Sequence, residues 1–282
     1  MAQITKAMEM VAASRMRRAQ QRVLAARPYA EAMRTLIGEL SAQGAAAGQE
    51  LHPLLAQRPV NAVGVVLITP DRGLAGPLNT NIIRRGAELI VEQENANMHV
   101  QVVTVGRKGQ DFLLRRGRKL LGTFTGLVDR PSYDDVIPVA RVIMDSYAAG
   151  VIGRAYVVYP RFVSTLVQRP EVVQLLPIAA PPGEVAAAGR PVVQDYIYEP
   201  DPATILAALL PRYVEVQVYR ALLETAASEQ SARMVAMRNA TENANELVDS
   251  LSLTYNKVRQ AGITREVTEI ASAAEAMAAM SR

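Results

Sequence analysis

The sequence contains no cysteine and no tryptophan, and its 282 residues include only 2 histidines and 3 phenylalanines. Without cysteine, a disulfide framework and a thiolate metal site are both excluded. His52 and His99 lie far apart and lack the spacing of paired metal ligands, so we expect no metal site. No grouping of Ser, His and Asp predicts nucleophilic catalysis either. We therefore expect no catalytic, cofactor-binding or metal-binding residues.

Long apolar runs are also missing. No run approaches the ~20 residues that a membrane-spanning helix requires, and the N-terminus lacks the apolar core of a signal peptide. We therefore expect a soluble intracellular protein. The net charge is +4, and basic residues gather near the N-terminus, at Arg15, Arg17, Arg18, Arg22 and Arg27. Such a cluster is usually a solvated face, and the more specific alternative is a surface for a partner.

Glycine and proline are scarce in two long stretches, residues 4–40 and 212–280. Both stretches show apolar residues at alternating steps of four and three, which predicts paired helices with a left-handed supercoil. The first stripe comprises Ala12, Met16, Ala19, Val23, Ala26, Ala30, Met33, Ile37 and Leu40. The second comprises Met237, Ala240, Ala244, Leu247, Leu251, Thr254, Val258 and Ala261. Pro28 should kink the first helix.

The middle of the chain alternates short Val/Ile-rich runs with helical stretches. We expect strands at 63–69, 99–105, 123–127, 155–159 and 166–178, the last one antiparallel at a sheet edge. Helices are expected at 79–93, 110–116 and 132–148, and a loop at 179–194. Asp201 should cap the final helix, with Pro202 at its first position. This alternation predicts a doubly wound sheet.

The fold class is therefore α/β: a long antiparallel coiled coil of the N- and C-terminal helices plus a small Rossmann-like α/β head domain. The expected parts are residues 1–57, 58–200 and 201–282. The loop from Asp71 to Gly76 follows a strand and precedes a helix, where Rossmann folds hold phosphates. It lacks the spacing of a dinucleotide fingerprint and of a P-loop, so we favour a tight turn.

Four segments carry a resemblance to a known family. They are residues 4–14 (ITKAMEMVAAS), residues 71–74 (DRGL) with Leu78, Asn79 and Asn81, residues 227–237 (ASEQSARMVAM) and residues 255–266 (YNKVRQAGITRE). Together they resemble the gamma subunit of rotary, F-type ATP synthases, in the same order and over nearly the whole chain. Ala75 and Pro77 depart from the Cys and Gly that are usual in that family.

The resemblance implies a rotor shaft that turns inside a ring of alpha and beta subunits and couples proton flow through the c-ring to ATP synthesis. It implies that Met8, Arg259 and Gln260 contact the beta subunit, and that Tyr213 and Glu215 lie near the c-ring and epsilon subunit. Further partners would be the alpha and delta subunits, with one copy of this chain per three alpha and three beta subunits. The chain would be a non-catalytic subunit without a cofactor, peripheral at the cytoplasmic face of the cell membrane, where only the complex holds it.

Two alternatives stay open at this stage. The α/β head could be a stand-alone nucleotide-binding enzyme, although the fingerprint loop is missing. The arginine-rich first helix could belong to a coiled-coil scaffold that binds nucleic acid, although few aromatic residues are present for stacking on bases. The family resemblance itself implies no nucleic-acid partner.

Overall fold

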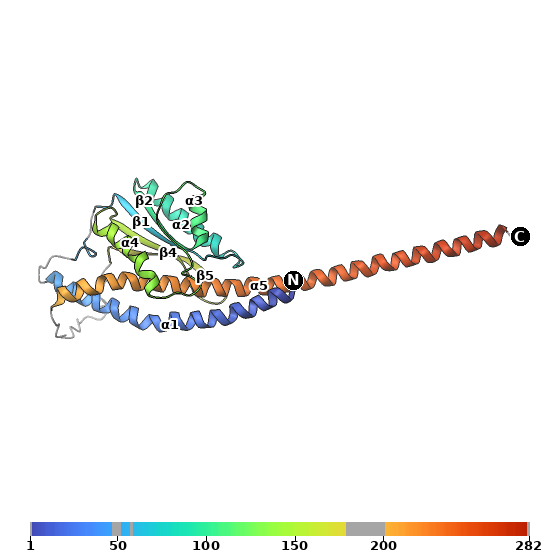
Figure 1. Ribbon diagram of the computed structural model, residues 1–282, viewed down its shortest axis with the longest axis horizontal. Coiled ribbons are helices and arrows are strands. Elements are labelled where there is room, and N and C mark those ends of the chain that lie inside the picture. The colour runs from blue at the N-terminus through green and yellow to red at the C-terminus, as the bar shows by residue number, and fades with distance from the viewer. Residues whose placement is uncertain (1, 47–51, 57–58, 179–200, 281–282) are drawn as a thin grey trace, which may run out of the picture. The chain divides into compact units, whose positions relative to one another are not determined.

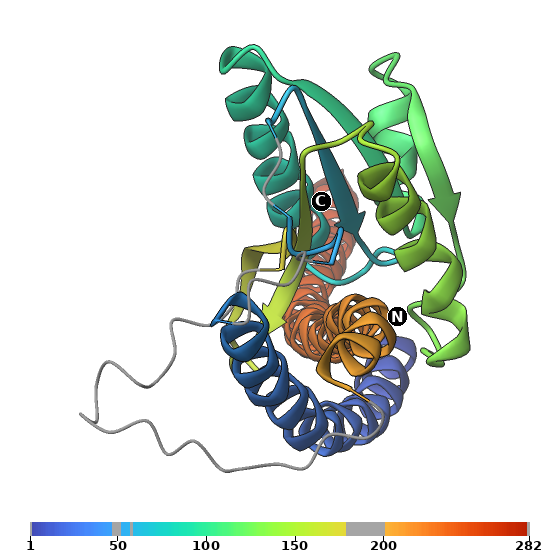
Figure 2. The same ribbon diagram turned by 90° about the vertical axis from the view of Figure 1, so that its left-hand side faces the viewer.

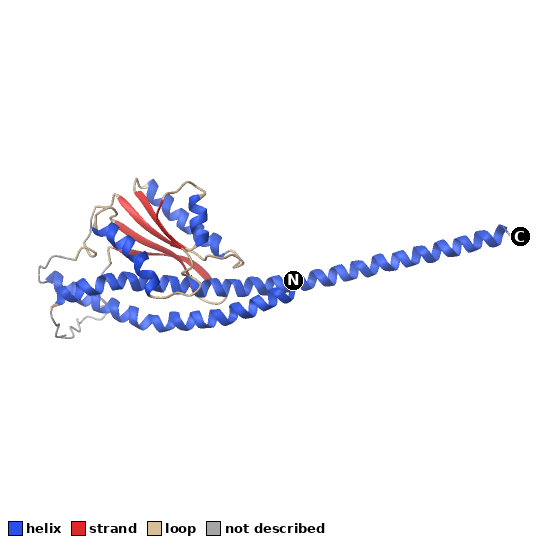
Figure 3. Cartoon of the chain, in the orientation of Figure 1, coloured by secondary structure: helices blue, strands red, loops and turns tan. Residues whose placement is uncertain are grey.

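The computed structural model describes residues 2–46, 52–56, 59–178 and 201–280. The elements in chain order are α1 (Ala2–Ala46), β1 (Ala62–Ile68), α2 (Leu78–Asn95), β2 (His99–Val105), α3 (Arg107–Leu114), β3 (Leu120–Phe124), η1 (Asp134–Val136), α4 (Ile137–Ala148), β4 (Arg154–Phe162), β5 (Gln168–Leu176) and α5 (Pro202–Met280), as Figures 1 and 3 show. By internal contacts the chain forms two units: Met10–Ala236, and Met1–Glu9 together with Met237–Arg282. Each unit is described by itself.

A five-stranded sheet in the order β3-β2-β1-β4-β5 forms the head of the larger unit. The first four strands are parallel, and β5 runs antiparallel to β4 at the edge. Every residue of the central strand β1 is buried, as its unbroken apolar sequence predicts. The doubly wound sheet and its antiparallel edge strand are therefore confirmed.

Helices cover both faces of this sheet (Figure 2). Val63, Val65 and Leu67 of β1 point to the face that packs under α2 and α3. Val66 and Ile68 point to the opposite face, where they share a core with α4 and with the two long helices. Because alternate residues of a strand face opposite sides, one strand joins both cores.

In the larger unit, α1 and α5 lie antiparallel and side by side. Near the middle of α1, Val23 packs against Leu223 and Ala227 of α5, and further along, Ile37 shares a core with Leu210. The buried members of the N-terminal stripe are Ala12, Met16, Val23, Ala30, Met33 and Ile37, whereas Ala19 and Ala26 are partly buried. Ile37, at 1% exposure, contributes roughly 1.5–3 kcal/mol of burial free energy. The side chain of Leu40 lies outside the described residues. Pro28 lies inside α1 without ending it.

The C-terminal stripe differs from the prediction. Met237 is buried, but Leu251 and Val258 are 59% and 66% exposed. In the smaller unit, Thr5 of α1 lies opposite Thr241 of α5, and Leu251 lies about three helical turns further along α5. The expectation that Leu251 packs in a seam between the two terminal helices is therefore wrong for the chain by itself.

Two element boundaries illustrate where local signals held and where they did not. The side chain of Asp201 caps α5, because its Oδ1 accepts a hydrogen bond from the backbone N–H of Thr204 at 2.9 Å. Strand β3 begins at Leu120 and not at the predicted Thr123. Leu120 pairs with Val102 and Gly122 pairs with Val103, so the ladder extends to residues before Thr123. The predicted loop at 179–194 lies outside the described residues.

Candidate functional site

The carboxyl edge of the sheet is where a Rossmann-like fold binds nucleotides, and here the chain's own side chains occupy it. At the start of α3, Thr69 Oγ1 accepts from the N–H of Gly109 at 2.9 Å, and Asp71 Oδ1 accepts from the N–H of Arg107 at 3.0 Å. The second oxygen of Asp71 accepts from the N–H of Gly126, also at 3.0 Å. These donors are the ones that a phosphate would need.

Gly106 brings the start of α3 this close to β1. Its φ of 97° lies in the region that favours glycine, and a Cβ there would lie 1.7 Å from the carbonyl oxygen of Thr69. The glycine therefore serves close backbone packing. At Gly76 the φ of 54° likewise supports the prediction that the Asp71–Gly76 loop is a tight turn.

Helix α5 closes the same edge from the other side. Arg233 Nη2 donates to the carbonyl oxygen of Gly73 at 3.1 Å and to Glu229 Oε1 at 2.5 Å. Burial raises the pKa of Glu229, and the Arg233 guanidinium opposes that rise. The loop between β1 and α2 is thus bound to the long helix rather than open to a ligand.

Other possible ligand sites are apolar or absent in the described part of the chain. An open hollow of about 730 Å³ lies over α2 and α3, and its floor includes Ile83, Val91 and Phe112. No group of three His, Asp or Glu side chains among the described residues could hold a metal ion. Within the same residues no helix is apolar over enough of its length to cross a membrane.

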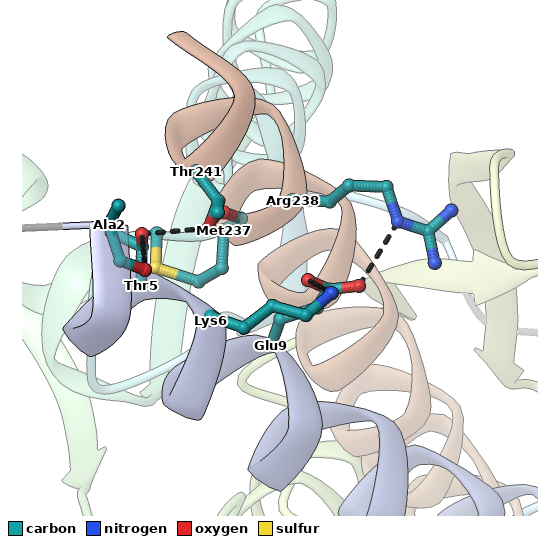
Figure 4. A network of polar contacts seen from close by, with 7 residues as sticks. All are labelled: Ala2, Thr5, Lys6, Glu9, Met237, Arg238 and Thr241. Carbon is teal, nitrogen blue, oxygen red and sulfur yellow. Dashed lines mark hydrogen bonds and ion pairs between the residues drawn. The ribbon is translucent and has the colours of Figure 1, made fainter. Parts of the chain in front are cut away.

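In the smaller unit, a polar clamp joins the first turns of α1 to α5 (Figure 4). The hydroxyl oxygens of Thr5 and Thr241 lie 2.7 Å apart. One turn further, the carboxylate of Glu9 accepts from Lys6 Nζ at 2.9 Å and from Arg238 Nε at 3.1 Å. The clamp residues are therefore Thr5, Lys6, Glu9, Arg238 and Thr241.

Glu9 is the centre of the clamp because it is 7% exposed, whereas the side chains of both cations are more than half exposed. The hydrogen bond from Lys6 lowers the pKa of Glu9, burial opposes that effect, and Arg238 lowers the pKa further. The carboxylate is thus held in its charged form. Sequence reasoning missed this site: the spacing of Lys6 and Glu9 permits their ion pair, but Arg238 is 229 residues away.

The residues expected to contact a beta subunit fall in the same unit but at separate places. Met8 is half-buried on α1, next to Glu9, whereas Arg259 and Gln260 are exposed on α5. They lie about five helical turns beyond Thr241, so the structure does not bring them together with Met8. One partner would have to contact the two places through different parts of its surface.

The residues expected to lie near a c-ring or epsilon subunit belong to the larger unit. Glu215 Oε2 accepts a hydrogen bond from Tyr133 Oη at 2.6 Å. Tyr213 is partly buried against the core that α5 shares with the sheet. Because of its bond to Tyr133, Glu215 already has a partner within the chain. Burial, together with this bond, raises the pKa of Tyr133.

The two long helices carry exposed surfaces of opposite character, and the apolar one is unusual for a monomer. Along the smaller unit's part of α5, large apolar side chains are more than half exposed: Leu247, Val248, Leu251, Leu253, Val258, Ile263, Val267 and Ile270. On α1, Arg15, Arg17, Arg18 and Arg22 are exposed. Monomeric proteins rarely leave so much apolar surface in water.

Comparison with known proteins identifies the family. The family model described as ATP synthase matches residues 1–277. The ATP synthase gamma chain of Roseiflexus castenholzii is 50% identical over 99% of this chain and 94% of that protein. The gamma chain of Dehalococcoides mccartyi is 49% identical over 98% and 94%. The central stalk and c-ring structure of the Tetrahymena thermophila mitochondrial ATP synthase contains a similar chain, with a TM-score of 0.63, 26% identity, and coverage of 84% of this chain and 99% of that one.

Proposed function

Because this chain belongs to the gamma chains of ATP synthases, it is a central rotor-shaft subunit, and we propose how its surfaces serve that role. The shaft couples proton flow through a membrane ring of c subunits to ATP synthesis on the alpha and beta subunits. We expect the chemistry to belong to those subunits; among the described residues of this chain, no group of three His, Asp or Glu side chains could hold a metal ion.

The observation that supports this role most strongly is the exposed apolar stretch of α5. From 245 to 274 every side chain is exposed, and side chains such as Leu251 and Ile270 are 59% and 70% exposed. A helix that is apolar on its surface needs a protein around it. A ring of alpha and beta subunits would cover this stretch, while the small and apolar side chains at its end would let it turn.

Torque contacts with the beta subunit are proposed at Met8, Arg259 and Gln260. The exposed guanidinium of Arg259 suits an acidic surface on the partner. Met8 offers an uncharged, flexible thioether that can pass a carboxylate without forming a fixed bond. Because the two places lie turns apart on different helices, they would be met by different parts of the beta subunit.

The other contacts are proposed for the larger unit. Tyr213 and Glu215 would lie near the c-ring or the epsilon subunit, with Tyr133 holding Glu215 in place through its 2.6 Å hydrogen bond. The delta subunit completes the set of partners. The chain would be present once per three alpha and three beta subunits, and it would reach the cytoplasmic face of the membrane only through the complex. As functional parts we propose residues 1–57 and 201–282 as the shaft and 58–200 as the head.

The nucleotide-enzyme alternative receives no support from the head. Asp71 and Thr69 already accept the N–H groups that a phosphate would use, and Arg233 already binds the neighbouring loop. Titration calorimetry of the full chain with ATP should therefore give no heat of binding. Filter binding at moderate salt should likewise show no affinity for nucleic acid.

Co-expression with the alpha and beta subunits of the same organism tests the assignment. We expect a stable complex in which native mass spectrometry finds one copy of this chain with three of each partner. The chain expressed alone should associate at high concentration, because its apolar stretch is exposed, and should stay soluble when it is dilute. A monodisperse homo-oligomer with no affinity for alpha and beta subunits would contradict the rotor role.

A further inference from the structure

Strand β4 is longer than its neighbour β1, and this leaves part of its backbone without a strand partner on one side. Pairing of β1 with β4 ends at Leu67 and Val158, while β4 continues to Phe162. On its other side β4 pairs with β5, where Pro160 lies opposite Pro170. Neither proline has an N–H to donate. On the side away from β5, the backbone groups of β4 beyond Val158 therefore need hydrogen-bond partners from outside the sheet.

Side chains of α5 supply these partners. Ser228 Oγ donates to the carbonyl oxygen of Pro160 at 3.0 Å, and Glu224 Oε2 accepts from the N–H of Phe162 at 3.3 Å. Ser231 Oγ donates to the carbonyl oxygen of Thr165, in the turn that follows, at 2.7 Å. Positions 224, 228 and 231 lie on one face of a helix.

These contacts are buried and electrostatically complete. Ser228 and Ser231 are 0% exposed and Glu224 is 1% exposed. The carboxylate of Glu224 also accepts from Arg220 Nε at 3.1 Å, so the buried charge has a counter-ion. Leaving such a charge without a partner would be costly. The arrangement therefore favours one rotational orientation of α5 relative to β4.

Arg233 makes a second attachment at another part of the head. Its Nη2 donates to the carbonyl oxygen of Gly73, in the loop after β1, and its orientation is held by Glu229 one turn earlier on α5. The helix is therefore tied both to the β4–β5 hairpin and to the β1–α2 loop. Two attachments at different places oppose rotation of the sheet about the helix axis.

Apolar contact alone would not oppose rotation of the sheet about the axis of α5. The hydrophobic effect is non-directional, so the core between α5 and the sheet resists separation more than it resists turning. Hydrogen bonds have preferred angles and weaken steeply when they are bent. We infer that Glu224, Ser228, Ser231 and Arg233 are positioning residues that form a torque joint, fixing the rotational setting of the head on the shaft so that load passes between them. The inference rests on the proposed rotor function.

The test uses the complete membrane complex carrying the double variant Ser228→Ala/Ser231→Ala. Each lost bond should weaken the joint by roughly a factor of five, and the head should slip when it is under load. Proton pumping per ATP hydrolysed should therefore fall about threefold or more. ATP hydrolysis by the detached complex of alpha, beta and this chain carries no load and should stay at the unmutated rate.

Thr225→Val is the matched control. Thr225 is equally buried on the same helix, but its hydroxyl donates to the helix's own carbonyl at Ala221. If the double variant and this control pump equally well in assembled complexes, the torque joint is wrong. If the double variant does not assemble, the single variant Ser231→Ala decides by the same criterion. Failure of the unmutated chain to join alpha and beta subunits would instead contradict the rotor function itself.

Discussion

Glu9 Oε1 lies 3.1 Å from Arg238 Nε, so a carboxylate in the third turn of the chain binds a guanidinium 229 residues later. Lys6 binds the other oxygen of the same carboxylate at 2.9 Å. This ion pair fixes the register of the two helices beside Met8, the residue proposed to contact the beta subunit. The clamp would therefore hold that contact in place.

Replacing Glu9 by Gln should loosen the first turns of α1. The side chain keeps its size but loses the charge that both cations bind, and pairs with exposed partners contribute about 0.2–1 kcal/mol each. Hydrogen exchange of the backbone amides from Thr5 to Glu9 in the assembled complex should become about two- to fivefold faster. Glu246→Gln, at an exposed position of α5, is the matched control. Equal exchange in both variants would show that the clamp contributes nothing.

The same clamp should respond to pH. Lys6 and Arg238 lower the pKa of Glu9, so its stabilising effect is present above the ordinary carboxyl pKa of about 4.3. It is lost as the pH falls through the lowered pKa, where Glu9 becomes protonated. Exchange in Thr5–Glu9 of the full chain, corrected for intrinsic rates, should therefore accelerate only at acid pH. Glu9→Gln should abolish this acceleration, and a variant that retains it would assign the effect to another group.

Leu251→Asp should leave the isolated chain almost unchanged. Leu251 is 59% exposed, and substitutions at such surface positions usually change stability by less than about 0.5 kcal/mol. In the complex, partners would cover this position, and a carboxylate there should weaken assembly with alpha and beta subunits. Ile37→Asp, at a position 1% exposed, should instead destabilise the chain itself. Circular-dichroism melting and co-purification separate the two effects, and normal assembly of Leu251→Asp would exclude burial of this position by partners.

Met8→Lys should uncouple the complex. If Met8 meets carboxylates of the beta subunit as proposed, a cation at this position would be worth about one to several kcal/mol, enough to favour one rotary position. ATP hydrolysis should continue while proton pumping and ATP synthesis fall, and Arg259→Ala should lower hydrolysis itself. Pumping assays on membrane vesicles measure both. Unchanged coupling in Met8→Lys would refute the proposed contact while leaving the family assignment intact.

Local signals in the sequence were sufficient for most of the fold. The apolar run of β1 and the heptad stripe through Val23 and Ile37 depend on near neighbours in the chain, and both are found where they were predicted. The cap at Asp201 has the same local origin. The family resemblance of residues 4–14 and 227–237 was likewise readable, because long motifs carry their own specificity.

Relationships between distant segments could not be predicted in this way. The bond from Ser228 to Pro160 exists because β1 ends before β4 does, and no local pattern encodes that difference. The heptad period around Leu251 does not say which helix covers it, so periodicity alone could not predict that this side chain is 59% exposed. The partner of Glu9 depends on a register that only the folded helices define.

Direct observation of rotation tests the rotor role most closely. The chain has no cysteine, so Thr125→Cys, at an exposed position of the head, provides a single labelling site when cysteine-free alpha and beta subunits are used. With the alpha and beta subunits fixed to a surface, a bead on this cysteine should turn stepwise in one direction when ATP is added, and it should stop when ATP is removed. A complex that hydrolyses ATP while the bead stays at one angle would contradict the account.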